Sequence, residues 1–113
     1  MSEIVGVVDV RAAEGRVDAV LAAFEACTTA THEEPGCLLY ALHRDNADPN
    51  HLVLLERWRS QEDLDAHFAT PHVATLLEFA AAPGNLAQPP QLTFTTGLGL
   101  GSPAKGRLQG AGG

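Results

Sequence analysis

Two histidines in the second half of the chain could move protons at neutral pH. His67 and His72 lie five residues apart, near the expected starts of two helical segments. An imidazole with an ordinary pKa of about 6.5 suits deprotonation of a substrate. A spacing of five does not place two ligands on one face of a helix, and no third soft ligand follows at a recognisable interval, so we predict no metal site. Two other interpretations stay open: His72 could cap its helix, and His67 could face solvent.

A carboxylate and an indole form a second candidate pair. Glu56 and Trp58 lie two residues apart in the segment HLVLLERW, so on a strand they share one face with Leu52 and Leu54. A carboxylate on such an enclosed face needs a hydrogen-bond partner. One interpretation is a pocket wall, with the indole stacked on a flat substrate and the carboxylate orienting it. The other is a strand-end glutamate paired with Arg or His, with the indole filling the core.

Other polar residues give weaker signals. Asp9 interrupts the apolar segment IVGVVDV, so it either ends the buried part of a strand or faces a cavity as a substrate-binding residue. Tyr40 is expected in the core or at a dimer contact more than as a proton donor. His32, His43 and His51 fall at expected element ends or in loops, and we predict that they are surface residues. The sequence contains no Gly-rich phosphate loop, no CxxC motif and no GxSxG motif.

The apolar pattern predicts how these residues are positioned. Strands are expected at 4–10, 37–44, 51–58 and 91–97, with a turn-rich loop at 45–50. A helix is expected between about 17 and the Pro35-Gly36 stop, and a helical region follows with N-caps at Ser60 and Thr70. The order β-α-β-β-α-β is typical of an α+β ferredoxin-like fold with a four-stranded antiparallel sheet.

Both faces of this sheet are expected to be apolar. Val8 and Val10 point to one side of the first strand and Val5 and Val7 to the other. Right-handed crossovers put all helices on one face of the sheet, which leaves the other face bare. A sheet face in water should be polar. We therefore predict a homodimer through the helix-free face.

Composition restricts the remaining possibilities. A chain of 113 residues fits one domain, which we expect at 1–97, followed by a Gly-rich tail at 98–113. Asp and Glu number 14 against 7 Lys and Arg, so a nucleic-acid partner is disfavoured. No apolar run is long enough to span a membrane, and no basic leader precedes the first strand, so we expect a cytoplasmic protein. Cys27 and Cys37 are expected to stay reduced and to pack as small apolar residues.

Taken together, these residues resemble the antibiotic-biosynthesis monooxygenase (ABM) family. The resemblance covers about residues 4–96, with the motifs in the family's order and spacing. The matching segments are Glu34-Pro35-Gly36-Cys37 with Tyr40, Glu56-Arg57-Trp58, and His67 with Thr70-Pro71-His72, against the family's E-x-G-C, Y, E-x-W and H-x-x-x-P-H. It implies a ferredoxin-like protomer that pairs sheet to sheet into a dimeric α+β barrel.

The resemblance also implies a chemistry. Family members that oxidise quinol- or anthrone-type aromatics use O2 without metal or flavin. It therefore implies a quinol-monooxygenase-like enzyme without cofactor, which takes O2 and a small electron-rich aromatic such as a quinol, phenol or anthrone. The implied catalytic residues are His72 or His67 as base and Glu56 as orienting carboxylate, with Trp58 and Tyr40 binding the substrate.

Other functions remain open because sister families degrade haem or isomerise phosphorylated sugars. Haem degradation is disfavoured, since Asp9 stands on the first strand where such proteins carry Asn, and Trp58 is not on the second helical region. The remaining alternatives are an isomerase or other non-oxidative enzyme acting on a small metabolite, and a non-catalytic ligand-binding dimer.

Overall fold

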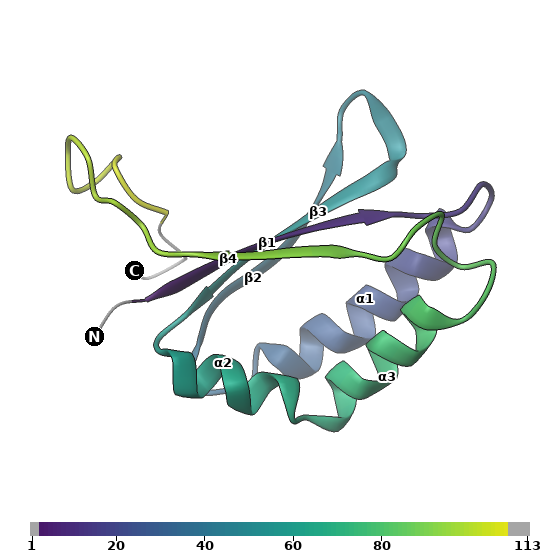
Figure 1. Ribbon diagram of the computed structural model, residues 1–113, viewed down its shortest axis with the longest axis horizontal. Helices are drawn as coiled ribbons and strands as arrows, with labels where there is room; N and C mark the ends of the chain where they lie inside the picture. Colours follow the sequence, from purple (N-terminus) through teal and green to yellow (C-terminus); the bar gives the residue numbers. More distant parts are fainter. Residues whose placement is uncertain (1–2, 109–113) are drawn as a thin grey trace.

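One antiparallel sheet carries all the helices on a single face (Figure 1). The computed structural model describes residues 3–108. The sheet order is β2-β3-β1-β4, so β1 and β3 are central and β4 is an edge strand. The elements are β1 (Ile4–Arg11), α1 (Val17–Thr31), β2 (Cys37–Asp45), β3 (Asp48–Trp58), α2 (Gln61–Phe68), α3 (Pro71–Ala81) and β4 (Gln91–Thr95). This confirms the predicted ferredoxin-like α+β fold.

The β2–β3 hairpin is tighter than expected. Asp45 pairs with Asp48, so the expected six-residue loop shrinks to Asn46 and Ala47. The N–H of Ala47 donates to Oδ1 of Asp45 over 2.8 Å, and the N–H of Asn50 donates to Oδ1 of Asp48 over 2.9 Å. Because these carboxylates accept hydrogen bonds from backbone N–H groups at the turn, the polar segment can continue the pairing of β2 with β3.

As a result, β3 begins at Asp48, and His51 lies inside the strand and not at its start as expected. Its ring donates to Oδ2 of Asp45 and to Oδ1 of Asp9, each over 2.8 Å, and its side chain is only 12% exposed. The carboxylate of Asp45, followed by that of Asp9, raises the pKa of His51. The prediction of His51 as a surface residue is therefore wrong, whereas His32 and His43 are exposed as predicted.

Two hydroxyl caps place the short helices. The N–H of Asp63 donates to Oγ of Ser60 over 3.2 Å, and the N–H of Val73 donates to Oγ1 of Thr70 over 3.4 Å, as predicted. Pro71 then occupies the first turn of α3. Because α2 ends at Phe68, His67 lies in its last turn and not near its start.

The core lies between the sheet and the helices. Alternate residues of β1 and β3 face the helices and are buried, among them Val10, Leu52 and Trp58. On the opposite face, Val7 and Leu55 pair with each other and are half-buried without any helix above them. The two-sided apolar pattern is therefore present in the fold.

Gly36 explains how two distant segments come close. A Cβ at this position would collide with the side chain of Asp63. The carbonyl of Gly36 accepts a hydrogen bond from the N–H of Arg59 over 3.0 Å. This close approach holds the connection between α1 and β2 against the start of α2, which brings Glu34 within reach of that helix.

Beyond β4 the described chain forms no helix or strand. Leu98 and Leu100 are 83% and 74% exposed there. We propose that the domain ends near residue 97 and that the tail is separate from it, although residues 109–113 of the expected tail lie outside the described part. Across residues 3–108, no helix combines the length and apolar character needed to cross a membrane.

Candidate active site

A nearly apolar cavity lies between the sheet and α2 and α3. About 50 Å³ of it is open to the centres of water molecules. Val8, Leu54, Phe68, Leu77 and Leu92 are among the apolar residues that line it. Three ionisable side chains share this wall: Tyr40 from β2, Glu56 from β3 and His67 from α2. The cavity thus combines an apolar lining with a few polar side chains, which is typical of small-molecule sites.

Glu56 is the carboxylate of this wall. It is 3% exposed, and its Oε1 accepts a 2.8 Å hydrogen bond from Nε1–H of Trp58, its neighbour on the same strand face. Burial raises the pKa of Glu56, the bond from Trp58 opposes that rise, and the charge of Glu34 adds to it. The folded protein therefore favours the protonated form of Glu56 more than the unfolded chain does.

Glu56→Gln is expected to stabilise the protein at alkaline pH. A raised folded pKa means that the stability contributed by the protonated carboxyl is fully present below the unfolded value near 4.5 and is lost as pH rises through the folded pKa. Glutamine keeps an oxygen for Trp58 and removes the buried charge. The melting temperature of the variant should exceed that of the wild type by a few degrees at pH 8, and the gap should shrink towards pH 4. Exposed Glu25→Gln should show no such pH-dependent gap, and a constant gap for Glu56→Gln would contradict the assignment.

His67 is the histidine among the residues that line the cavity. It is 2% exposed, and its Nδ1–H donates to Oε2 of Glu34 over 2.8 Å. Its ring lies 4.4 Å from the Trp58 ring and 5.5 Å from the Tyr40 ring, centre to centre. Within residues 3–108 no group bonds to its Nε2. Burial lowers the pKa of His67 and the carboxylate of Glu34 opposes this shift, so the neutral ring is favoured with Nε2 free to accept a proton.

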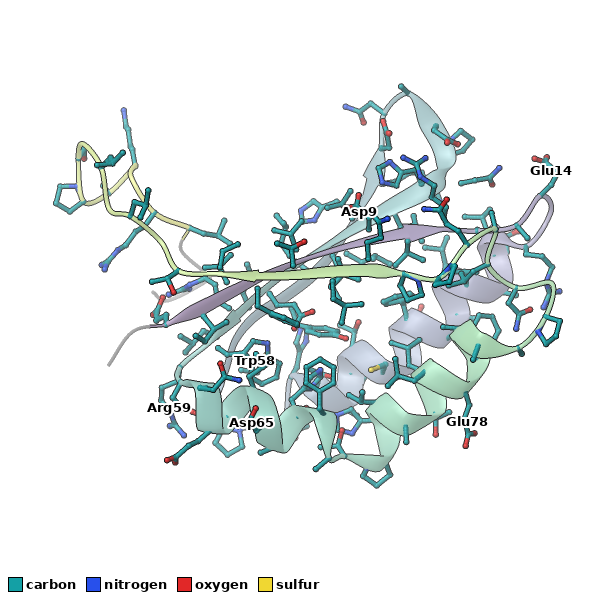
Figure 2. All side chains as sticks on the ribbon, viewed as in Figure 1. Asp9, Glu14, Trp58, Arg59, Asp65 and Glu78 are labelled. Carbon is teal, nitrogen blue, oxygen red and sulfur yellow. The ribbon has the colours of Figure 1, made fainter. Side chains whose placement is uncertain are left out.

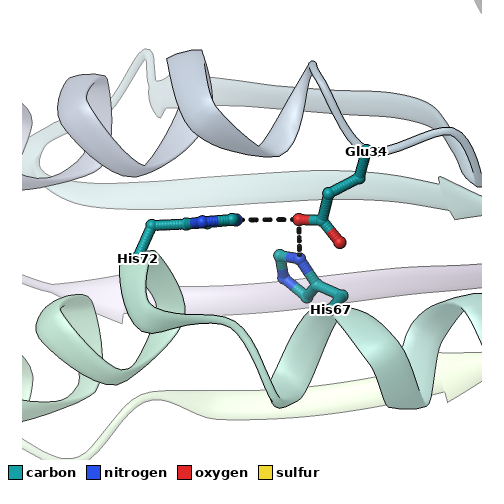
Figure 3. A group of neighbouring side chains, drawn as sticks. All are labelled: Glu34, His67 and His72. Carbon is teal, nitrogen blue, oxygen red and sulfur yellow. Dashed lines mark hydrogen bonds and ion pairs between the residues drawn. The ribbon is translucent and has the colours of Figure 1, made fainter.

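Glu34 connects the two histidines (Figure 3). The same Oε2 atom accepts a second hydrogen bond, from Nε2–H of His72, also over 2.8 Å. The His72 side chain is 21% exposed and the Glu34 side chain 14%. His72 and Glu34 are absent from the cavity wall, so His72 reaches it only through Glu34 and His67.

Tyr40 is the third polar group of the wall. It is 5% exposed, and its hydroxyl lies 3.8 Å from Sγ of Cys27. Burial raises the pKa of Tyr40 well above its ordinary range, with a further contribution from Cys27. The phenol therefore stays protonated and can donate to a ligand.

Burial also raises the pKa of the Cys37 thiol to about 11, and both cysteines are free, in agreement with the predicted reduced state.

The structure brings only part of the predicted site together. His67, Glu56 and Tyr40 share the cavity, whereas Trp58 is fully buried and does not line it. Figure 2 shows Trp58 between the sheet and α2. The His67 ring packs against it, 4.4 Å away centre to centre. The expected stacking wall is thus a support behind the cavity.

Asp9 lies on the opposite side of the sheet. Figure 2 shows it on the face away from the helices, where His51 donates to it. It therefore does not line the cavity as a substrate-binding residue, because Asp9 is one residue out of phase with Val8 and Val10 on β1.

Sequence reasoning assigned no role to Glu34. It stands 33 residues before His67 and 38 before His72, so no local spacing could associate them. The available signal was its place at the start of the E-P-G-C segment.

Fold and site together define a ferredoxin-like protein with a carboxylate-bound histidine on an apolar cavity. Residues 4–86 match the family model of antibiotic biosynthesis monooxygenases, and the chain belongs to this family. It is 40% identical to a Mycobacterium tuberculosis protein that is provisionally named a monooxygenase. The alignment spans 72 residues, which are 64% of this chain and 67% of that protein. The family and this relative support a monooxygenase-like role.

Other similarities agree with the fold. A solved structure from Mycobacterium tuberculosis superposes with a TM-score of 0.75 at 29% identity, covering 83% of this chain and 93% of that one. A structure from Nitrosomonas europaea gives a TM-score of 0.80 at 24% identity, covering 86% and 91%. An uncharacterised Synechocystis protein is 34% identical over 62 residues, which are 55% of this chain and only 41% of that protein.

Proposed function

We propose that the protein is a cofactor-independent monooxygenase that oxidises an electron-rich aromatic, of quinol, phenol or anthrone type, with O2. One observation carries the proposal: His67 lines an apolar cavity while Glu34 holds its Nδ1, which leaves Nε2 without a hydrogen-bond partner among the described residues. This arrangement fixes the ring and the tautomer in the form that a general base requires. His67 replaces His72 as the favoured base because only His67 reaches the cavity.

The reaction begins with proton transfer from the substrate to Nε2 of His67. The resulting anion passes one electron to O2, and the two radicals combine into a peroxide on the ring. The imidazolium returns the proton, and the O–O bond breaks. One oxygen stays on the ring and the other leaves with two substrate hydrogens as water, so AH2 + O2 gives AO + H2O. All four electrons that reduce O2 come from the substrate.

The remaining groups of the cavity have supporting roles. The apolar wall excludes water, which strengthens the polar contacts inside it. Glu56 and the Tyr40 hydroxyl can hydrogen-bond the oxygens of a phenolic ring and orient it. None of the residues that line the cavity is Lys or Arg. A phosphorylated sugar would need such a cation, so the cavity favours the oxygenase over a sugar-phosphate isomerase.

Oxygen uptake with a panel of quinols, phenols and anthrones tests the proposal. The enzyme should consume one O2 for each molecule of product with at least one member of the panel. With labelled ¹⁸O2, one labelled atom should appear in the product and the other in water. Product formation without O2 uptake, or the absence of any oxygen label in the product, would exclude a monooxygenase.

We also propose that the protein works as a homodimer through the helix-free face of the sheet. Val5, Val7, Val53 and Leu55 are half-buried there, and no described helix covers them. A partner on this face should bury more than about 1,200 Å² in total.

Sedimentation at micromolar concentration should give twice the mass of the chain. Leu55→Asp should yield monomers while Ala22→Asp, on the exposed side of α1, stays dimeric. A monomeric wild type would contradict the proposal.

A further inference from the structure

We propose that Glu34, His67 and His72 bind a divalent transition metal ion of the zinc type, and that the bound ion switches off the base. The inhibition of the base rests on the proposed function, whereas the binding of the ion does not. Each of the three residues offers one ligand atom, and these atoms lie within 4.8 Å of one another. Nδ1 of His67 and Nε2 of His72 are each 2.8 Å from Oε2 of Glu34. In Figure 3 these three atoms converge on one point from three separate segments of the chain.

The donor set and its spacing suit zinc. Zn²⁺ binds imidazole nitrogen and carboxylate oxygen at about 2.0–2.2 Å, commonly with three protein ligands and one open position. Tetrahedral geometry at such bond lengths separates the ligand atoms by roughly 3.3 Å. Glu34 now lies 2.8 Å from each ring nitrogen. An ion could enter if the proton on each of these nitrogens moves to the other nitrogen of its ring and the three side chains move slightly apart.

The cluster is both held in place and accessible. His67 is buried and its ring packs against Trp58, which restrains the innermost ligand. Glu34 and His72 are partly exposed, so an ion can arrive from solvent at the outer side of the cluster. The sequence predicted no metal site because the two histidines are five residues apart and no third ligand follows at a recognisable interval. The third ligand comes from the connection between α1 and β2.

The position of the ion determines its effect. It would bind Nδ1, whereas the free Nε2 of the same ring serves the cavity, and neither Glu34 nor His72 lines that cavity. Two histidines and a carboxylate also suit Fe(II) oxygenases, but O2 on an ion outside the cavity would not meet the substrate. A neutral imidazole bound through Nδ1 carries its proton on Nε2. His67 could then no longer accept a proton, so the ion should inhibit turnover.

Titration with Co²⁺ and Zn²⁺ tests the binding and the inhibition separately. Wild-type protein should bind one Co²⁺ with a visible absorption band, and Zn²⁺ should displace it. His72→Ala and Glu34→Gln should each weaken the affinity by about 10- to 100-fold or more, with circular dichroism confirming that they fold. His43→Ala removes an exposed histidine outside the cluster and should bind as tightly as the wild type.

Measurements of turnover then test whether the bound ion inhibits the enzyme. Oxygen uptake by the wild type should fall as Zn²⁺ saturates the site, with the same half-point as the cobalt displacement. No cobalt band, or equal affinities of His72→Ala and His43→Ala, would overturn the metal site. A saturated site with undiminished turnover would overturn the inhibition. If the wild type oxidised no substrate at all, the proposed function would fail while the cobalt titration would still decide the metal site.

Discussion

Replacing His67 with alanine should lower kcat by about 100-fold or more. General-base catalysis contributes typically 10²- to 10⁴-fold, and His67 is the one histidine that lines the cavity in the described part of the chain. Binding should change less than turnover, because most of the wall is apolar and remains. Steady-state oxygen uptake with the best substrate of the panel gives kcat and KM separately.

Three further variants separate this account from a general loss of structure. His67→Gln keeps much of the side-chain volume and can still donate to Glu34, yet it should remain as slow as His67→Ala. His72→Ala should be slowed less, because His72 acts only through Glu34. His43→Ala should match the wild type. Wild-type kcat in His67→Ala would remove this residue from the mechanism.

Trp58→Ala should produce the largest loss of stability, about 3–5 kcal/mol in the free energy of unfolding. Trp58 is completely buried, and its ring packs against the His67 ring. Removing the indole leaves a cavity and also deprives the buried Glu56 of its hydrogen-bond donor. Trp58→Phe fills part of the space but has no N–H, so its loss should be intermediate.

Urea denaturation measures these differences in the free energy of unfolding. Phe68→Ala is a suitable comparison, since Phe68 is 39% exposed in the same region and should lose much less stability. The change for Trp58→Phe should be larger at pH 8 than at pH 4, because the bond from Trp58 lowers the pKa of Glu56 and its loss penalises the charged carboxylate, a form that gains weight as pH rises. A loss below about 1 kcal/mol for Trp58→Ala would contradict its role as the support of the cavity.

Local chemistry explains why the fold was predictable. Ser60 and Thr70 combine N-cap residue types with helical patterns after them, and both cap as expected. The hairpin turn was placed wrongly because Asp45 and Asp48 were taken as loop residues. Their side chains bond backbone N–H groups at the turn and so extend the strands, and His51, expected at the start of its strand, therefore lies inside β3.

The site was less predictable because it depends on contacts between distant segments. The two-residue period correctly put Glu56 and Trp58 on one face, but which of them meets the cavity depends on where α2 crosses the sheet. Asp9 falls on the other face by the same period. Glu34 reaches the histidines from a connection that packs closely against Asp63 at Gly36. No spacing along the chain encodes that contact.

The central claim is that His67 removes a proton from the ligand in the cavity, and an anaerobic titration tests it most directly. Without O2 the reaction stops after proton transfer, so a phenol or quinol whose anion absorbs at a longer wavelength reports its own protonation state when bound. At pH 7 a larger fraction of the bound ligand should show the spectrum of the anion in wild type and in His43→Ala than in His67→Ala. If the bound ligand has the same spectrum in wild type and in His67→Ala, His67 is not the base.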